Sequence, residues 1–396
     1  RPEAASPAAA PRAGPSAEDR SAEAEPVENG SPHREHYKHH IMKKFLYIIS
    51  ILLIALAGCK KDPEPELPLQ PLKSANCFIV SEAGRYSFET VKGEGNESVG
   101  EVVAAEVLWE SFGTDKYPSA GSLIKSVSYK DGEIIFKTTD KKGNAVIAAK
   151  DADGNILWSW HIWLTDQPKE QEYDNNAGTV MDRNLGATSS TPGEVTSLGL
   201  LYQWGRKDPF IGSSMIDMCV EARSTLPSGH PVVQSDKKTG KVEYAIANPT
   251  TFIGYNYGNY DWYYTGSSST DNTRWSASEK TIHDPCPRGW RVPESSDIWT
   301  EASGSAGEFT MTYDTDLDGM DFSGKFGSDD SIWYPAAGSR FSVDGSLSDI
   351  PWSGNYWTAT PEDKDACGLK ITNKDEVDPA CGYQRATALS VRCVKK

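Results

Sequence analysis

The chain has 396 residues, with 40 Lys and Arg against 56 Asp and Glu, which gives a formal net charge of −16. At roughly 150 residues per domain, this length predicts two or three domains. The acidic balance argues against a non-specific nucleic-acid binder, which needs clustered Lys and Arg to neutralise phosphates. The 34 Gly and only 6 Met favour strands and turns over helical bundles, and the 12 Trp, 17 Tyr and 11 Phe argue against a disordered chain.

Residues 42–58 have the pattern of an export signal. Lys43 and Lys44 form a cationic start, and Phe45–Leu56 is an apolar run that is too short to span a bilayer as a helix. Leu-Ala-Gly then leads into Cys59, a sequence that resembles the bacterial lipobox, in which the cysteine is acylated and becomes the first residue of the mature protein. The sequence therefore predicts a membrane anchor of two or three acyl chains at Cys59.

The segments on either side of this signal are expected to lack a core. Residues 1–41 are rich in Ala, Pro and Glu and would block an N-terminal signal, so we expect a spurious or disordered leader and a true start at Met42. Residues 59–74 are predicted to be a Pro-rich, extended tether. The charged residues directly after Cys59 resemble the surface-export signals of Bacteroidetes lipoproteins, which implies an outer-membrane protein that faces the cell exterior.

Residues 75–169 read as a series of strands. They are rich in β-branched and aromatic residues, alternate in several stretches, and contain hairpin turns such as Lys130-Asp131-Gly132. This pattern predicts a small antiparallel β-sandwich. Trp158, Trp160 and Trp163 are interpreted as core or interdomain residues, with a ligand platform as the alternative.

Residues 170–396 differ in composition and pattern from the residues before them, with short regular segments joined by long connections. Gly, Ser, Asn, Asp and Trp are scattered through this part of the chain. The stretch Tyr255–Trp275 is so dense in aromatic residues that we expect it to be ordered against the body of the domain.

Five motifs in this second part occur in the order of a known family. They are DRNLGA at 182–187, LYQWGRKDP at 201–209, DPCPRGWRVP at 284–293, NYWTAT at 355–360 and SVRCV at 390–394. Together they resemble the Fibrobacter succinogenes major paralogous domain, which is abundant in surface lipoproteins and fimbrillin-associated proteins of Bacteroidetes. The resemblance covers about residues 178–396 and implies a C-type-lectin-like α+β domain with a small sheet, one or two helices and long loops.

The resemblance also implies a disulfide between Cys286 and Cys393, because in this kind of fold a cysteine before the helix commonly bonds one in the last strand. The helix is expected to begin near Ser295 or Ser296. Cys367 and Cys381 flank a plausible hairpin and are candidates for a second bond, whereas Cys77 and Cys219 are left without an assigned partner. An even number of cysteines after Cys59 permits such a framework in an oxidising compartment.

One acidic segment is a candidate calcium site. Asp314, Asp316 and Asp318 alternate and are followed by a glycine, as in the first half of an EF-hand loop. The twelfth position is Lys325 instead of a bidentate Glu, so the EF-hand interpretation fails. Two interpretations stay open, a looser calcium loop and an acidic surface turn. The E-P-N, Q-P-D and W-N-D tripeptides of calcium-dependent lectins do not occur in this domain.

Aromatic side chains are the candidates for ligand binding, because such rings stack on sugars and proteins alike. The candidates are Trp262, Tyr263, Tyr264, Trp275 and Trp352, although packing in the core or the loops is the first interpretation of each and ligand binding the second. No catalytic residue is assigned, since the chain has no H-E-x-x-H, G-x-S-x-G, Walker or C-x-x-C motif. After Cys59 the remaining imidazoles are His161, His230 and His283.

The sequence thus predicts a surface-exposed bacterial lipoprotein with a non-catalytic adhesion or ligand-binding role. The expected fold is mostly β or α+β, a β-sandwich followed by a C-type-lectin-like domain. The expected partners are an extracellular glycan or protein, or fimbrial subunits if the protein is a fimbrial accessory or tip. No cofactor is expected beyond a possible calcium ion. The alternative is a glycan-processing or other cell-surface enzyme with an unrecognised site.

Overall fold

The computed structural model describes residues 66–173, 178–214, 229–267, 270–276, 278–294, 299, 313–322 and 332–396. The chain divides into two compact units, Arg1–Glu66 and Leu67–Lys396, and the elements given below belong to the second. The part of the chain that the structure describes is mostly β, with 42% strand and 4% helix. The predicted signal, Cys59 and Cys219 lie outside the described residues. In the part of the chain that the structure describes, no helix is long and apolar enough to cross a membrane.

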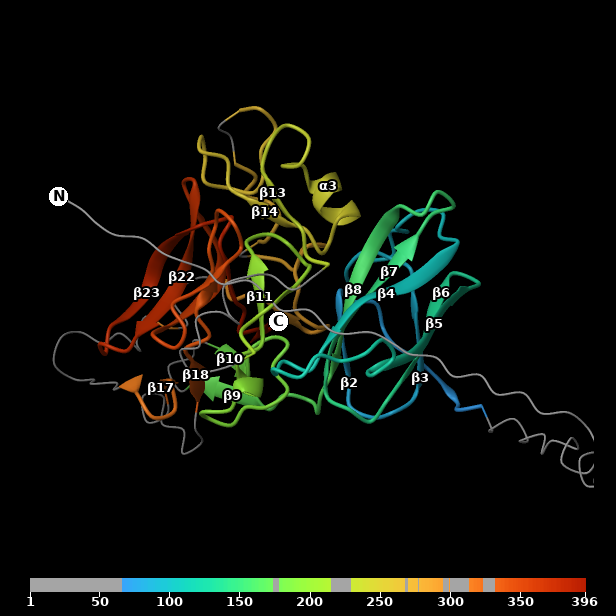
Figure 1. The fold of residues 1–396 in the computed structure, drawn as a ribbon, viewed down its shortest axis with the longest axis horizontal. Helices are drawn as coiled ribbons and strands as arrows, with labels where there is room; N and C mark the ends of the chain where they lie inside the picture. The colour runs from blue at the N-terminus through green and yellow to red at the C-terminus, as the bar shows by residue number, and fades with distance from the viewer. Residues whose placement is uncertain are drawn as a thin grey trace, which may run out of the picture. The chain divides into compact units, whose positions relative to one another are not determined.

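The first half of this unit contains two four-stranded sheets (Figure 1). One sheet has the order β1 (Leu69–Pro71), β3 (Arg85–Glu89), β6 (Glu133–Thr138) and β5 (Ile124–Lys130). The other has the order β2 (Cys77–Val80), β8 (Ile156–Leu164), β7 (Gly143–Lys150) and β4 (Ala104–Ser111). The first two strands of the unit join different sheets. β1 pairs in parallel with β3, and β2 pairs in parallel with β8.

Aromatic rings from the two sheets meet in a common core. Phe88 of β3 stacks on Phe78 of β2 with ring centroids 4.5 Å apart and lies 5.0 Å from Trp160 of β8. Trp158 belongs to the same buried cluster. The interpretation of these tryptophans as core residues is therefore confirmed, and neither forms an exposed ligand platform.

The predicted tether is shorter than expected. Residues 69–71 form β1 instead of a free linker, and the backbone N–H of Leu72 donates to Ser87 O at 2.7 Å. The side chains of β1 are exposed, so backbone hydrogen bonds to the edge of β3 hold this strand. An alternation of apolar residues could not have revealed it, because almost nothing on the strand is buried.

The second half is built around an eight-stranded sheet. Its main path is β12 (Phe210–Ile211), β11 (Leu200–Gln203), β24 (Ala388–Ser390), β21 (Ser353–Glu362), β22 (Asp365–Thr372) and β23 (Val377–Gln384), with β19 (Ser339–Arg340) and β20 (Leu347–Ser348) beside it. A four-stranded sheet has the order β15 (Trp290–Arg291), β25 (Val394–Lys395), β10 (Gly178–Met181) and β9 (Glu170–Tyr173). Smaller elements are β13 (Val232–Gln234), α3 (Val242–Ala247), β14 (Phe252–Gly254), β16 (Tyr313–Asp314), β17 (Gly319–Asp321), β18 (Trp333–Pro335) and the 3-10 turn η1 (Val195–Ser197).

The two ends of the second half pair with each other. Val180 of β10 lies opposite Val394 of β25 in an antiparallel register. The motif SVRCV is not one strand, however, because it is shared between β24 and β25, which belong to different sheets. Residues 391–393 bridge them, and the Val391 carbonyl accepts from Leu185 N at 2.9 Å.

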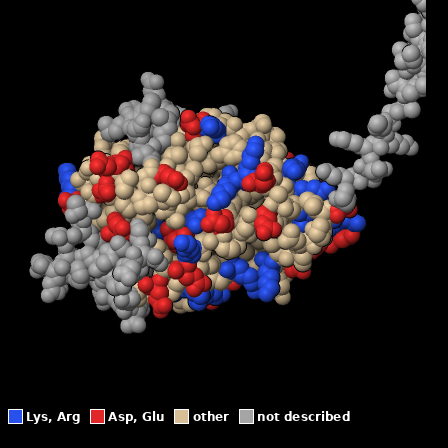
Figure 2. All heavy atoms as spheres, turned by 90° about the horizontal axis from the view of Figure 1, so that it is seen from below, with Lys and Arg blue, Asp and Glu red and all other residues tan. Residues whose placement is uncertain are grey.

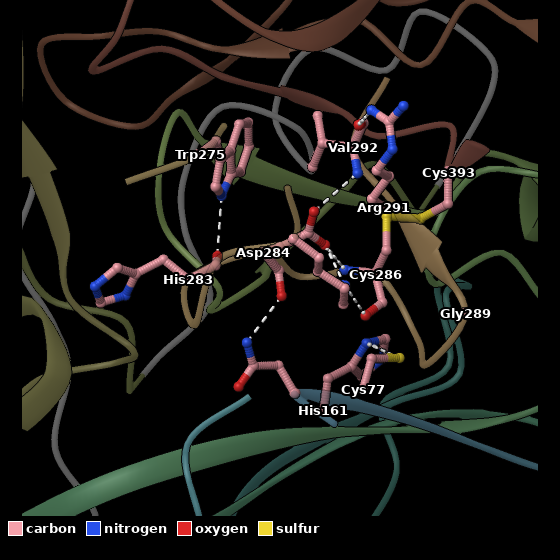
Figure 3. Close-up of a disulfide and its surroundings, with 12 residues drawn as sticks. Cys77, His161, Trp275, His283, Asp284, Cys286, Gly289, Arg291, Val292 and Cys393 are labelled. Atoms are coloured by element: carbon pink, nitrogen blue, oxygen red, sulfur yellow. Dashed lines mark hydrogen bonds and ion pairs between the residues drawn. A yellow bond between two sulfur atoms is a disulfide. The ribbon is translucent and has the colours of Figure 1, made fainter. Parts of the chain in front are cut away.

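The disulfide between Cys286 and Cys393 is present, with a Cα–Cα distance of 6.0 Å (Figure 3). It joins residues 107 apart in the sequence, a loop for which the chain-entropy model gives a stabilisation of about 4–5 kcal/mol. The helix expected near Ser295 lies outside the described residues, apart from the helical, buried Trp299.

The hairpin predicted between Cys367 and Cys381 is confirmed as β22 and β23, but the disulfide prediction there is wrong. Both cysteines are free. Cys367 lies opposite Gly382, and Cys381 lies opposite Gly368. Since neighbouring residues of a strand point to opposite faces, the two thiols are on different sides of the sheet and cannot bond.

Candidate functional site

Two of the sequence motifs hydrogen-bond to each other inside the protein. The indole N–H of Trp204, in LYQWGRKDP, donates to Thr358 O at 3.0 Å, and the indole N–H of Trp357, in NYWTAT, donates to Tyr202 O at 2.7 Å. Both indoles are fully buried. The exchange fixes β11 against β21, so these tryptophans hold the sheet together and are not available to a ligand.

A buried arginine ties the last motif to the first. Arg392, in SVRCV, donates to Asn184 Oδ1 at 3.0 Å, to Met181 O at 3.1 Å and to Trp333 O at 2.7 Å. Its guanidinium also lies 4.2 Å from the Tyr334 ring centroid. Neutral acceptors and a π-face thus replace the water that the cation loses. The arginine of this motif therefore has a structural role.

Strand β8 is buried on both faces. Trp158, Trp160 and Ile162 enter the core of the first half, whereas Trp163 belongs to a cluster with Met181, Leu185 and other residues of the second half. The Trp163 indole N–H donates to Ala187 O at 2.9 Å. Alternate side chains of β8 therefore enter two different cores, and neither face of the strand is open to solvent.

The motif LYQWGRKDP supplies an ion pair to this second face. Lys207 Nζ lies 2.6 Å from Asp208 Oδ1 and 2.6 Å from Ser159 Oγ of β8, and Ser159 donates to the same carboxylate. The two charged side chains are only 2% and 7% exposed. Burial lowers the pKa of Lys207, and Asp208 opposes that shift. Sequence reasoning missed this pair, because adjacent Lys and Asp are usually on the surface.

The motif DPCPRGWRVP makes a second connection to the first half (Figure 3). The Asn76 amide donates to Ile282 O at 2.7 Å and to Asp284 O at 2.8 Å. The Asp284 carboxylate accepts from the backbone N–H groups of Cys286 at 2.8 Å and Val292 at 2.9 Å. This carboxylate therefore shapes the turn that carries the disulfide.

A thiol, an imidazole and an amide are aligned beside that turn. Cys77 Sγ lies 3.3 Å from His161 Nδ1 (Figure 3). His161 Nε2 lies 2.8 Å from Asn144 Oδ1. The order Cys, His, Asn occurs in cysteine nucleophiles, which need a thiolate and an imidazolium. Burial has the reverse effect here, because it raises the pKa of Cys77 well above its usual value and lowers the pKa of His161 to about 3.

At neutral pH this thiol is therefore protonated and the imidazole neutral. Both side chains are at most 2% exposed, which denies a substrate access to the sulfur. The arrangement is a packed polar contact between β2, β7 and β8. His283 is also mainly structural, because burial lowers its pKa to about 4 and its ring lies 6.1 Å from Trp158.

Two predicted ligand-binding tryptophans are core residues. Trp262 is 1% exposed, donates to Trp204 O at 2.8 Å and lies 4.3 Å from the Arg274 guanidinium. Trp275 is buried beside Trp204 and donates to His283 O at 2.9 Å. Their assignment as ligand-binding residues is wrong, because the aromatic stretch encloses a buried cation.

The enclosed cation explains why the stretch folds inward. Arg274 donates to Asp261 Oδ2 at 2.8 Å, and both side chains are at most 1% exposed. The half-buried Tyr263 ring lies 5.2 Å from the same guanidinium, and the half-buried Tyr264 donates its backbone N–H to Gly240 O. A desolvated ion pair needs such cover on every side. These two tyrosines therefore cover the loop, and neither lines the groove described next.

Trp352 is the predicted ligand residue that stays at the surface. It is 48% exposed and lines a groove of about 490 Å³ over β21, β22 and β23. The other lining residues are almost all polar: Ser339, Asp349, Ser353, Asn355, Lys370, Thr372, Asn373, Lys374, Glu376 and Tyr383. No residue of the stretch 255–275 lines it, so the structure does not bring Trp262 and Trp352 to one site.

The floor of this groove, which we call the Trp352 groove, is fixed by hydrogen bonds. Asn355 Oδ1 accepts from the Tyr383 hydroxyl at 2.7 Å, and the Asn355 amide donates to Gly338 O at 3.2 Å. Burial raises the pKa of Tyr383, so this hydroxyl stays protonated. Tyr383 also packs against the buried Trp357, with ring centroids 5.8 Å apart. The groove is therefore supported from below by the sheet.

The candidate calcium residues form a hairpin turn. Asp314 and Asp318 flank the turn between β16 and β17, and Asp314 Oδ1 accepts the backbone N–H groups of Asp316 and Leu317, both at 2.9 Å. That carboxylate oxygen is used within the turn, as in an acidic surface turn. Among the residues that the structure describes, no group of three or more His, Cys, Asp or Glu side chains is placed to hold a metal ion.

Charged residues on the surface are mixed in sign. On the face drawn in Figure 2, Lys and Arg lie interspersed with Asp and Glu, and no continuous basic field covers it. Comparison with known protein families, with characterised proteins and with solved structures finds no match to this chain. The family resemblance of the five motifs accordingly stays a prediction.

The buried imidazoles make stability depend on pH. The pKa of His161 is about 3 in the folded protein against an ordinary value of 6.5, so below pH 6.5 the unfolded chain binds a proton that the folded chain refuses. The stabilisation is complete above that pH and is lost as the pH falls. Urea titrations should show that His161→Gln removes about 2 kcal/mol of the stability decrease between about pH 6.5 and pH 5. An unchanged pH dependence would show that His161 is not the titrating group.

Replacing a buried tryptophan and replacing an exposed one should change the free energy of unfolding by different amounts. Trp262→Ala removes a buried ring from beside a buried guanidinium and should lower the free energy of unfolding by about 3–5 kcal/mol. Trp352→Ala removes a half-exposed ring and should change it by about 0.5 kcal/mol or less. Urea denaturation followed by circular dichroism measures both. Equal losses in the two variants would contradict the burial difference.

Proposed function

We propose that this chain is a surface-exposed bacterial lipoprotein with a non-catalytic role in adhesion or ligand binding. Its described unit would then be a β-sandwich followed by a C-type-lectin-like domain. An extracellular glycan or protein is the proposed partner, and fimbrial subunits are the partners if the protein works as a fimbrial accessory or tip. Anchoring at Cys59 would place it in the outer membrane, facing the exterior.

The sequence and the disulfide support the export part of the proposal. Residues 42–58 have the tripartite pattern of a signal and end at a lipobox-like cysteine. The Cys286–Cys393 bond fits an exported protein, because disulfides persist in oxidising compartments and are rare in the cytosol.

The Trp352 groove is the single observation that carries the binding part. Most tryptophans of the described unit are buried as packing or hydrogen-bonding groups, whereas Trp352 is half exposed at the edge of a polar groove. A large exposed aromatic ring on a rigid sheet offers contact area at a small entropic cost.

The alternative function, a cell-surface enzyme, gains no support from the aligned thiol and imidazole. Cys77 and His161 are buried and hold the protonation states of a packed contact, as described above. The Trp352 groove contains two carboxylates, Asp349 and Glu376, but paired carboxylates are common in an acidic chain and do not by themselves define a glycosidase.

The anchor is tested by removing the thiol that would be acylated. In a Bacteroidetes host supplied with a labelled fatty acid, the wild-type chain should incorporate label and be digested by protease added to intact cells. Cys59→Ala should remain an unlabelled precursor of higher mass, because the modifying reaction has no acceptor. Cys367→Ala, which removes a free cysteine far along the chain, is the control. Label retained in Cys59→Ala would contradict the lipobox.

The binding role is tested with the unanchored ectodomain, residues 60–396. Probed on an array of glycans and extracellular proteins, it should capture at least one class of ligand without changing it chemically. Mass spectrometry of the captured ligand reports any turnover. Release of a cleaved or modified product would favour the enzyme alternative instead.

A further inference from the structure

We infer that the Trp352 groove binds a neutral pyranose unit of a glycan chain, with the Trp352 ring against the sugar's apolar face and without a metal ion. This inference rests on the proposed binding function and names the ligand class of its site. It is carried by three features of the described residues: the exposure and support of the ring, the chemistry of the groove walls, and the balance of charge within them.

The backbone that carries the Trp352 ring is held in place, and the ring itself is open to solvent. The Trp352 backbone N–H donates to Asp349 O at 2.8 Å, and the Trp352 carbonyl accepts from Asn373 N at 2.9 Å. The side chain is 48% exposed. An aromatic face on a fixed backbone can bury the C–H groups on one side of a pyranose ring without first ordering the main chain that carries it.

The walls offer both donors and acceptors at close range. Lys370 and Lys374 supply ammonium donors, and Asp349 and Glu376 supply carboxylate acceptors. The hydroxyl oxygens of Tyr383 and Thr372, whose O–H groups donate to Asn355 and Glu376, can still accept a hydrogen bond. Each hydroxyl of a sugar is at once a donor and an acceptor, so it matches a lining that mixes the two. An apolar small molecule would instead need a mainly apolar cavity.

The charges in the groove cancel. Two ammonium groups, Lys370 and Lys374, are accompanied by two carboxylates, Asp349 and Glu376. A uronic or sialic acid would meet carboxylates as well as lysines, and a highly cationic chain would meet the lysines. The core of a protein–protein interface, in contrast, is depleted in Lys, Glu and Asp. A neutral sugar brings no charge into the groove, so it is repelled by none of these four groups.

The groove is also open rather than enclosed, since seven of its eleven lining residues are exposed or half-exposed, among them Asp349, Asn373 and Lys374. Its volume of about 490 Å³ falls within the range of small-ligand sites. An open groove of this size fits one or two units inside a longer chain, so the expected ligand is a polysaccharide rather than a free monosaccharide.

The experiment uses the ectodomain, residues 60–396, in buffer containing EDTA. The probes are neutral polysaccharides (β-glucan, mannan, xylan and galactan), polygalacturonate as an acidic polysaccharide, and fibronectin and collagen as proteins. Calorimetry or affinity electrophoresis should detect binding to at least one neutral polysaccharide. Trp352→Ala should weaken that binding about tenfold or more, and Trp352→Phe should retain most of it, because the stacking face remains.

Two controls distinguish the loss of a contact in the groove from a loss of folding. Tyr117→Ala removes an aromatic ring that lies outside the groove and is even more exposed than Trp352, and it should leave the affinity unchanged. Circular dichroism melts of each variant confirm that the fold is intact. If Trp352→Ala proved unfolded, Thr372→Val, which is nearly isosteric and removes one groove hydroxyl, would replace it and should weaken binding measurably.

The outcomes that overturn the inference differ from those that overturn the proposed function. Binding only to polygalacturonate, fibronectin or collagen refutes the neutral-sugar assignment while the binding role stands. Binding to a neutral polysaccharide that Trp352→Ala leaves unchanged refutes the groove, and binding that EDTA abolishes refutes the metal-free mode. Failure of the ectodomain to bind any of these probes or any ligand on the array refutes the binding function itself.

Discussion

The structure of the described unit depends on strand β8, because its two faces enter two different cores. Trp158 and Trp160 fill the core between the first two sheets, and Ser159, His161 and Trp163 face the second half of the chain. The second face includes a buried ion pair, Lys207 with Asp208, which hydrogen-bonds to Ser159. Separating the two halves would break the hydrogen bonds that Ser159 and Asn76 make to the second half, and it would expose apolar side chains such as Trp163 that the two halves bury together. The halves are therefore parts of one compact unit.

The need to satisfy buried polar groups also explains the role of the five motifs. Their Trp, Arg, Asp and Asn side chains satisfy buried backbone groups or one another, as Arg392 does with three carbonyl or amide oxygens. With little helix and many irregular connections, the second half cannot satisfy its buried polar groups through regular secondary structure alone. Side chains take over that task. A pattern of this kind specifies a fold and leaves the ligand to residues outside the motifs, such as Trp352 and Lys370.

Burial also decides which reactive groups can act. Cys77, His161 and Asn144 have the residue types and close contacts of a nucleophile, yet desolvation favours the neutral thiol and the neutral imidazole. Arg274 shows the opposite case, since Asp261 and three aromatic rings compensate a cation that is fully buried. Chemistry with an extracellular ligand is left to the surface, where the Trp352 groove combines an open aromatic face with balanced charges.

The sequence by itself determined the mostly-β composition, the series of strands before residue 169 and the Cys286–Cys393 bond, the last through a family resemblance. These follow from local alternation, turn residues and motif order. The tertiary structure alone decided that Cys367 and Cys381 lie on opposite faces of one hairpin, that β1 joins a sheet, and that Trp262 and Trp275 are buried whereas Trp352 is exposed. The physical reason is that an aromatic residue has the same local pattern in a core and at a binding surface. Only neighbours that are distant in the sequence, here Trp204 for both Trp262 and Trp275, determine which of the two it joins.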